Sequence, residues 1–192
     1  MRRVAGMMAL GLLVAGCGGG SRGEESVTTS TSTPPSVVEQ VVTSSTSSIQ
    51  PSAEQDAILA AYKGYWDTWL AANDPPNPDH PDLERYATGS AYSRAVEATR
   101  KHRDLGQRFR LPEGARYSHN PIDVLVDGDR AEVRDCSVDD GLIVDSSTGA
   151  VLNDAVNTRL IKAELVREGD QWKLHDAAVI SEWEGVSGCV DW

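Results

Sequence analysis

Residues 157–183 read NTRLIKAELVREGDQWKLHDAAVISEW, and this stretch decides the fold. The three residues Glu168-Gly169-Asp170 are typical of a tight turn, and apolar and polar residues alternate on both sides of them. Alternation with a period of two indicates a strand with one packed face and one wet face. The stretch therefore predicts a hairpin of two antiparallel strands, each of about ten residues.

Two further strands are predicted before this hairpin. They cover residues 116–126 (RYSHNPIDVLV) and 130–138 (RAEVRDCSV), and Asp127-Gly128-Asp129 between them is a strong hairpin turn. Pro121 indicates either a sheet edge or a bulge, because proline cannot donate to the strand ladder. The segment 139–153 is looser and predicts a shorter hairpin.

Helical spacing dominates the chain before these strands. Ser52 and Gln55 are typical of a capping box, which predicts a helix over residues 53–73. A short helix over 81–86 and a third over 91–107 are expected to follow. The first helix places six residues on one face: Ile58, Ala61, Tyr62, Tyr65, Trp66 and Trp69. We interpret this stripe as core, the alternative being that Tyr62, Tyr65 and Trp69 line a pocket mouth.

The N-terminus predicts export and anchoring. Residues 1–16 combine two arginines with a short apolar run, and Leu13-Val14-Ala15-Gly16 leads directly into Cys17. This segment resembles a bacterial lipoprotein signal, which implies that Cys17 is lipidated after cleavage and holds the chain at the cell membrane, on its extracytoplasmic side. The alternative is an ordinary secretory signal with an incidental cysteine. Residues 17–52 are rich in Ser, Thr, Gly and Pro and are expected to be a disordered tether. The folded domain is then 53–192.

Two cysteines remain, Cys136 and Cys189. In an oxidising compartment we expect them to form a disulfide, which would close a loop of about 53 residues and contribute about 4 kcal/mol on the chain-entropy model. The alternative of a metal site has little support, because neither cysteine has another Cys or His at ligand spacing. We expect no metal and no cofactor.

The charge limits the possible partners. The chain carries a formal net charge of −11, and such an acidic protein repels phosphate backbones, so we expect no nucleic-acid partner. The run Arg100-Lys101-His102-Arg103 is interpreted as a solvated helix face, the alternative being a contact with anionic headgroups or an acidic partner.

Helices followed by antiparallel strands indicate an α+β arrangement, with helices packed on a curved sheet. Over about residues 53–192 this order resembles the nuclear transport factor 2-like superfamily, the cone-shaped, cystatin-like fold of ketosteroid isomerases and SnoaL-type cyclases. In particular, the chain resembles uncharacterised actinobacterial lipoproteins of that type. The most specific matches are 128–136 and 169–179, with a buried Trp172. These motifs are structural. No catalytic motif of the superfamily can be matched here, so the resemblance implies no active site.

The candidate catalytic residues are polar side chains that are expected to point from the strands into the interior of the fold. If Ala131 and Val133 face the core, Asp135 shares their face. His119 could then form an acid–base pair with Asp123 or with Asp135, the alternative being that these groups are exposed or satisfied by turns. The walls of such a pocket would be Tyr65, Trp69 and Trp172.

The function expected from these features is that of a lipid-anchored envelope protein whose domain binds or scaffolds without catalysis. Its partners would be the membrane, through the lipid on Cys17, and either an envelope protein or an apolar small molecule. The alternative is an isomerase- or cyclase-type enzyme that uses Asp135 and His119 in a pocket. The oligomeric state stays open.

Overall fold

A computed structural model describes residues 52–189 of the 192-residue chain. The predicted signal, Cys17 and the tether lie outside the described residues, as do the last three residues. The described helices and strands are α1 (Ala53–Asn73), α2 (Leu83–Tyr86), α3 (Gly89–Asp104), β1 (Gln107–Arg110), β2 (Ser118–Asp127), β3 (Arg130–Asp139), β4 (Leu142–Asp145), β5 (Val151–Asn153), β6 (Asn157–Glu168) and β7 (Gln171–Glu184).

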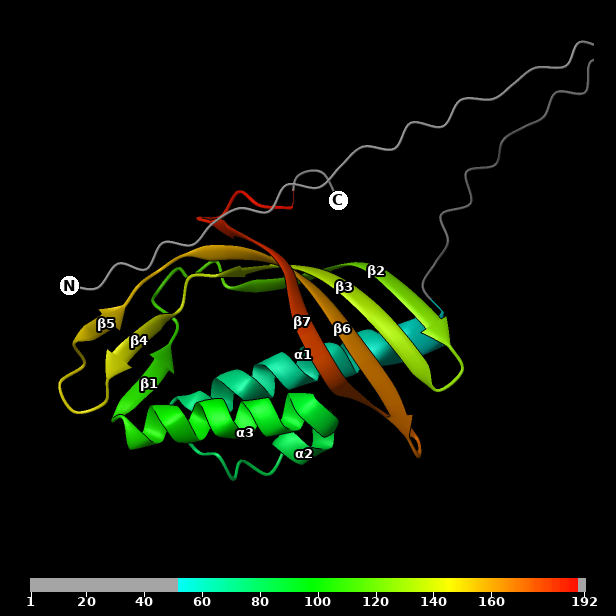
Figure 1. The fold of residues 1–192 in the computed structure, drawn as a ribbon, viewed down its shortest axis with the longest axis horizontal. Helices are drawn as coiled ribbons and strands as arrows, with labels where there is room; N and C mark the ends of the chain where they lie inside the picture. Colours follow the sequence, from blue (N-terminus) through cyan, green and yellow to red (C-terminus); the bar gives the residue numbers. More distant parts are fainter. Residues whose placement is uncertain (1–51, 190–192) are drawn as a thin grey trace, which may run out of the picture. The chain divides into compact units, whose positions relative to one another are not determined.

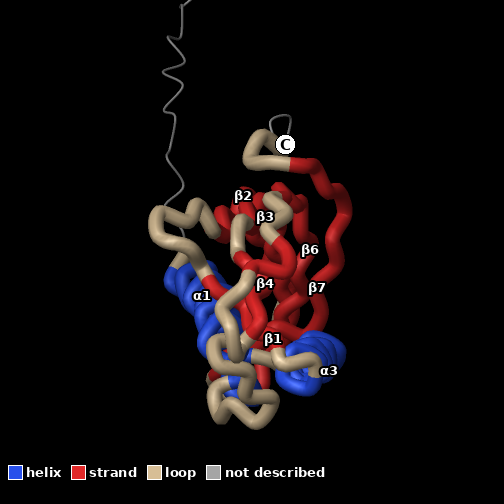
Figure 2. Tube along the Cα trace, turned by 90° about the vertical axis from the view of Figure 1, so that its left-hand side faces the viewer, coloured by secondary structure: helices blue, strands red, loops and turns tan. Residues whose placement is uncertain are grey.

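The main sheet has the strand order β2-β3-β6-β7, and all neighbouring strands are antiparallel. It arches over α1 and α3, as Figure 1 shows. In the view of Figure 2, α1 lies on the side of β2 and α3 on the side of β7. The predicted hairpin forms β6 and β7, which supply half of the main sheet. The expected α+β fold class is therefore confirmed.

A second sheet, β1-β4-β5, contains a strand that the sequence pattern did not reveal. Gln107 was expected to end the third helix, but α3 ends at Asp104 and Gly106, at φ 64°, turns the chain into β1. The buried Phe109 on β1 packs so closely on Gly141 that a Cβ there would lie 1.9 Å from its ring. Glycine at this position lets the strand approach.

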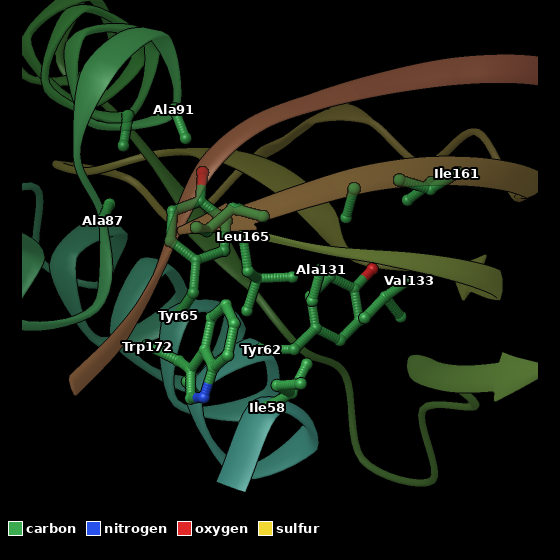
Figure 3. Close-up of a cluster of buried hydrophobic side chains, with 14 of the residues drawn as sticks. Ile58, Tyr62, Tyr65, Ala87, Ala91, Ala131, Val133, Ile161, Leu165 and Trp172 are labelled. Carbon is green, nitrogen blue, oxygen red and sulfur yellow. The ribbon is translucent and has the colours of Figure 1, made fainter. Parts of the chain in front are cut away.

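The core lies between α1 and the main sheet. The capping box at the start of α1 is confirmed, because the Ser52 hydroxyl accepts from the Gln55 amide while the Gln55 side chain accepts from the Ser52 amide. On the predicted face, Tyr62 and Tyr65 are buried, and Figure 3 shows their rings with Trp172 in the cluster of buried side chains. Such rings bury a large apolar area, so their burial stabilises the packing of α1 on the sheet.

The C-terminal segment returns to the main sheet. Cys189 follows β7, and its Cα lies 6.1 Å from that of Cys136 on β3, with the two sulfur atoms at disulfide distance. The segment after β7 is therefore fastened to the centre of the sheet. Of the helices in the described part of the chain, none has the length and hydropathy that crossing a membrane requires.

Candidate functional site

Four polar side chains from three separate parts of the chain meet between α1 and the main sheet. The Tyr62 hydroxyl donates to Oδ2 of Asp135 at 2.9 Å. Nδ1 of His119 lies 2.6 Å from the same oxygen, and Nε2 of His119 lies 3.2 Å from the Tyr117 hydroxyl. The cluster is thus a continuous chain of hydrogen bonds from α1 to the segment that enters β2.

Asp135 is at the centre of this cluster and has no exposed surface. It faces inward because β3 alternates, and Ala131 and Val133 on the same face are buried in the core. Its Oδ2 accepts both bonds, whereas Oδ1 has no hydrogen-bond partner within residues 52–189. A buried carboxylate needs such donors, because burying it without them costs roughly several kcal/mol.

A bulge in β2 aims His119 at Asp135. The register between β2 and β3 shifts between Pro121 and Asp123, so Ile122 is an extra residue on β2. Strict alternation would put His119 and Val124 on opposite faces of the strand. With the bulge, His119 opposes Ser137 and Val124 opposes Val133, so both side chains face inward.

The His119 ring is also held by aromatic neighbours. Trp66 stacks on it, with ring centroids 4.1 Å apart and an interplanar angle of 13°. Tyr62 and Tyr117 meet its ring edge to face. The side chain is only 11% exposed, so its orientation is fixed by packing as well as by hydrogen bonds.

The two tyrosines act as donors. Burial raises the pKa of Tyr62, and the neighbouring Asp135 carboxyl raises it further. Burial also raises the pKa of Tyr117, with a second contribution from Asp139. Both hydroxyls therefore keep their protons at neutral pH. In the tautomer in which Nδ1 of His119 donates to Asp135 and Nε2 carries no proton, Nε2 accepts from Tyr117.

Two cavities adjoin this cluster, and His119, Tyr117 and Trp66 line both. The larger has a volume of about 580 Å3 and lies between α1 and residues 111–121. Its apolar wall consists of Leu59, Leu70, Leu111 and Pro121. The smaller, of about 160 Å3, extends toward the inner face of β3 and β6. The larger is within the usual size range of small-molecule sites, about 300–1,000 Å3.

The sequence-predicted site residues are only partly brought together. Of the two expected partners of His119, Asp135 contacts it, while Asp123 lies beyond the bulge and is exposed. The three expected wall residues do not converge. Trp69 lines the smaller cavity, whereas Tyr65 is a core residue and Trp172 is a core residue that lines a separate hollow beside Ala57 and Arg85.

The remaining features considered from the sequence are the basic run 100–103 and the alternative of a metal site. In the basic run, Arg103 pairs with Asp104, and His102 turns inward to Oδ1 of Asn73 at 2.9 Å. No group of three or more His, Cys, Asp or Glu in residues 52–189 is arranged to hold a metal ion.

Two contributors to the site were not singled out from the sequence. Trp66 was assigned only to the core stripe of α1, yet it stacks on His119 and lines both cavities. Tyr117 was included in the predicted strand 116–126 but was given no role. The signal that could have identified it is its spacing of two residues from His119, which puts both side chains on one face of a strand.

Comparison with known proteins identifies the fold but no family. No protein-family model and no curated protein sequence matches the chain. Among solved structures, the intermembrane space region of the chloroplast protein ARC6 is similar at a TM-score of 0.50 and 17% identity, over 69% of this chain and 98% of that one. An uncharacterised Caulobacter vibrioides protein with a cystatin-like fold aligns at a TM-score of 0.38 and 12% identity, over 66% and 89%. At this identity, the ARC6 similarity supports the fold alone.

Proposed function

We propose that this chain is an extracytoplasmic lipoprotein, anchored through Cys17, whose domain binds a small molecule without transforming it. The leader and Cys17 motivate the anchor. The resemblance to nuclear transport factor 2-like lipoproteins and the disulfide-distance pair Cys136–Cys189 support an extracytoplasmic domain. The observation that carries the binding function is the cavity of about 580 Å3 beside a fixed polar cluster.

The hydrogen bonding of the cluster favours binding over catalysis. Nδ1 of His119 is engaged by Asp135 and Nε2 by Tyr117, so neither ring nitrogen is left for a substrate proton. Tyr62 is committed to Asp135. A general base must reach the proton that it abstracts, and here that would require breaking an existing bond. A fixed network of this kind instead shapes a site and orients a ligand.

The test is to isolate the bound compound. The full chain is purified from the membranes of a cell that makes it, extracted with organic solvent, and the extract is analysed by mass spectrometry. We expect a small molecule that is retained by Leu105→Arg and lost from Leu111→Arg. Leu111 lines the cavity and is 37% exposed, so arginine can be accommodated there while blocking the cavity; Leu105 is 56% exposed and lies on α3's C-cap. An extract without such a compound, from protein that instead retains a protein partner, would support scaffolding and contradict this proposal.

The anchor has its own test. Cys17→Ala should move the chain from the membrane fraction to the soluble fraction, because the acyl chains provide the attachment. Unchanged fractionation would argue against lipidation at Cys17.

The 2.6 Å contact between His119 and Asp135 favours one further candidate, an acid–base enzyme of the isomerase or cyclase type. In that case Tyr117 would swing away and expose Nε2 to the larger cavity. Turnover of a ring-bearing carbonyl or epoxide substrate that Asp135→Asn abolishes would establish this activity. Binding without turnover would leave the non-catalytic function standing.

A further inference from the structure

The larger cavity has walls suited to flat, apolar groups. On α1, Leu59, Trp66 and Leu70 line the cavity. From Leu59 to Leu70 the helix rises by roughly 16 Å, at about 1.5 Å per residue. Leu111 and Pro121 close the cavity from the other side. Aromatic edges from Tyr62, Tyr117 and His119 add ring surface, which prefers contact with other rings.

The charged residues at this cavity are already paired. Lys63 and Asp67 line it, and they form an ion pair with each other on the exposed side of α1. In the smaller cavity, Arg159 pairs with Asp139 at 3.0 Å and with Glu182 at 3.3 Å. Thus a charged ligand would have to compete for these partners or lose its hydration without gaining a counter-charge, which is unfavourable.

One polar contact that the cavity offers is the Tyr117 hydroxyl. When Tyr117 donates its proton to Nε2 of His119, its oxygen retains a lone pair for a donor from the ligand. Ser118 also lines the cavity, where its hydroxyl accepts from the Asn120 amide at 3.0 Å and keeps its own proton for a further bond. The Asp135 carboxylate lies behind His119 and would repel an anion.

We infer that the larger cavity takes an uncharged, ring-bearing, mainly apolar molecule that carries a single hydroxyl-type hydrogen-bonding group, and that this group lies against Tyr117. This inference rests on the proposed binding function and specifies its ligand. An organic cation is the closest competitor, because aromatic faces attract cations. It is disfavoured because His119 covers a face of Trp66 and because Asp67 is paired.

The test is isothermal titration calorimetry with three naphthalene probes that differ only in charge and polar group: 2-naphthol, 2-naphthoate and 2-naphthylmethylammonium. The full chain is held in lipid nanodiscs, with empty nanodiscs as the blank for partitioning. We expect saturable binding of 2-naphthol and binding of both charged probes weaker by about tenfold or more. Equal or tighter binding of either charged probe, or no saturable binding of 2-naphthol, would overturn the inference.

Single-residue variants test whether 2-naphthol binds in the larger cavity. Tyr117→Phe should weaken 2-naphthol binding by about threefold to tenfold, the usual effect of one hydrogen bond. Tyr92→Phe is the control, because its hydroxyl bonds to Glu84 on the surface of the helices. Leu111→Arg should remove binding, and Leu105→Arg should leave it unchanged. A Leu111→Arg protein that binds 2-naphthol normally would place the probe elsewhere and contradict the inference.

The two proposals fail in different ways. If extraction of the purified chain yields a charged small molecule that Leu111→Arg loses, the binding function stands and the inferred ligand class is wrong. If extraction yields no small molecule and 2-naphthol does not bind, both are wrong.

Discussion

At the scale of single residues, Asp135 is the group on which the site depends. It has no exposed surface, and its oxygen accepts from two side chains that are themselves packed among aromatic rings. Removing one partner of a buried polar pair costs more than the pair contributes, because the remaining donors lose their acceptor without regaining water. Asp135 is therefore important for stability whatever the ligand is.

Asp135→Ala should lower the free energy of unfolding by about 3–5 kcal/mol, because the Tyr62 hydroxyl and the His119 N–H would both lose their acceptor. Urea denaturation followed by tryptophan fluorescence measures this change. The control is Asp170→Ala in the exposed β6–β7 turn, where a change within about 0.5 kcal/mol is expected. A loss under about 1 kcal/mol for Asp135→Ala would contradict the described cluster.

The pKa of a second carboxyl group, that of Asp145, leads to a prediction about stability at acidic pH. Asp145 accepts hydrogen bonds from the amides and hydroxyls of Ser147 and Thr148, and these bonds lower its pKa to about 2. Since the pKa is lower in the folded chain, the contribution to stability is fully present above the unfolded pKa, about 3.9, and is lost as the pH falls toward 2.

A carbonyl-detected NMR titration should therefore give a pKa near 2 for Asp145, and Asp145→Asn should remove this part of the acid destabilisation. A measured pKa close to 4 would show that the turn does not hold its carboxylate as described.

At the scale of elements, the sequence predicted what depends on local pattern and missed what depends on a single extra residue or a distant partner. The capping box, α1 and the β6–β7 hairpin follow from spacing that any reader of the chain can see. The bulge at Ile122 does not, because Pro121 is equally consistent with an edge strand. Unless the position of the bulge is known, the alternation of odd and even residues along β2 does not show whether the His119 side chain faces inward.

Strand β1 was missed for a related reason. Its four residues, Gln107 to Arg110, are too few to show a period, and the pairing that stabilises them is with β4, more than thirty residues later. Likewise, the sequence places Tyr62 on the core face of α1, but only the fold shows that its hydroxyl reaches Asp135, 73 residues away.

The start of α1 gives a prediction at this scale. Ser52→Ala should cost about 1 kcal/mol of stability, because the Gln55 amide loses the oxygen that it donates to. Ser52→Asp should cost much less, since aspartate is as good an N-cap as serine and its charge suits the helix N-terminus. The pair is compared by chemical denaturation, and equal losses in both variants would mean that the cap contributes nothing.

At the scale of the whole molecule, the cysteines connect the sheet centre to the segment after β7 across 53 residues of sequence. A disulfide here would restrict the unfolded chain, so Cys136→Ser with Cys189→Ser should lower the free energy of unfolding by about 4 kcal/mol. The comparison is made by denaturation under oxidising conditions, with dithiothreitol on the unchanged chain as an independent route to the same loss. If neither treatment changes the unfolding midpoint, the two sulfur atoms are not bonded in solution.

The central claim is that the cavity beside His119 is the ligand site of this domain. The most direct measurement is the 1H–15N spectrum of the five tryptophan indole groups in the full chain during titration with 2-naphthol. Trp66 lines the cavity and stacks on His119, whereas Trp172 lies in the core and Trp183 near the end of β7. We predict that the Trp66 indole signal shifts in a saturable manner while those of Trp172 and Trp183 stay in place. Saturable shifts at Trp172 or Trp183 with an unmoved Trp66 would place the ligand elsewhere and contradict the account.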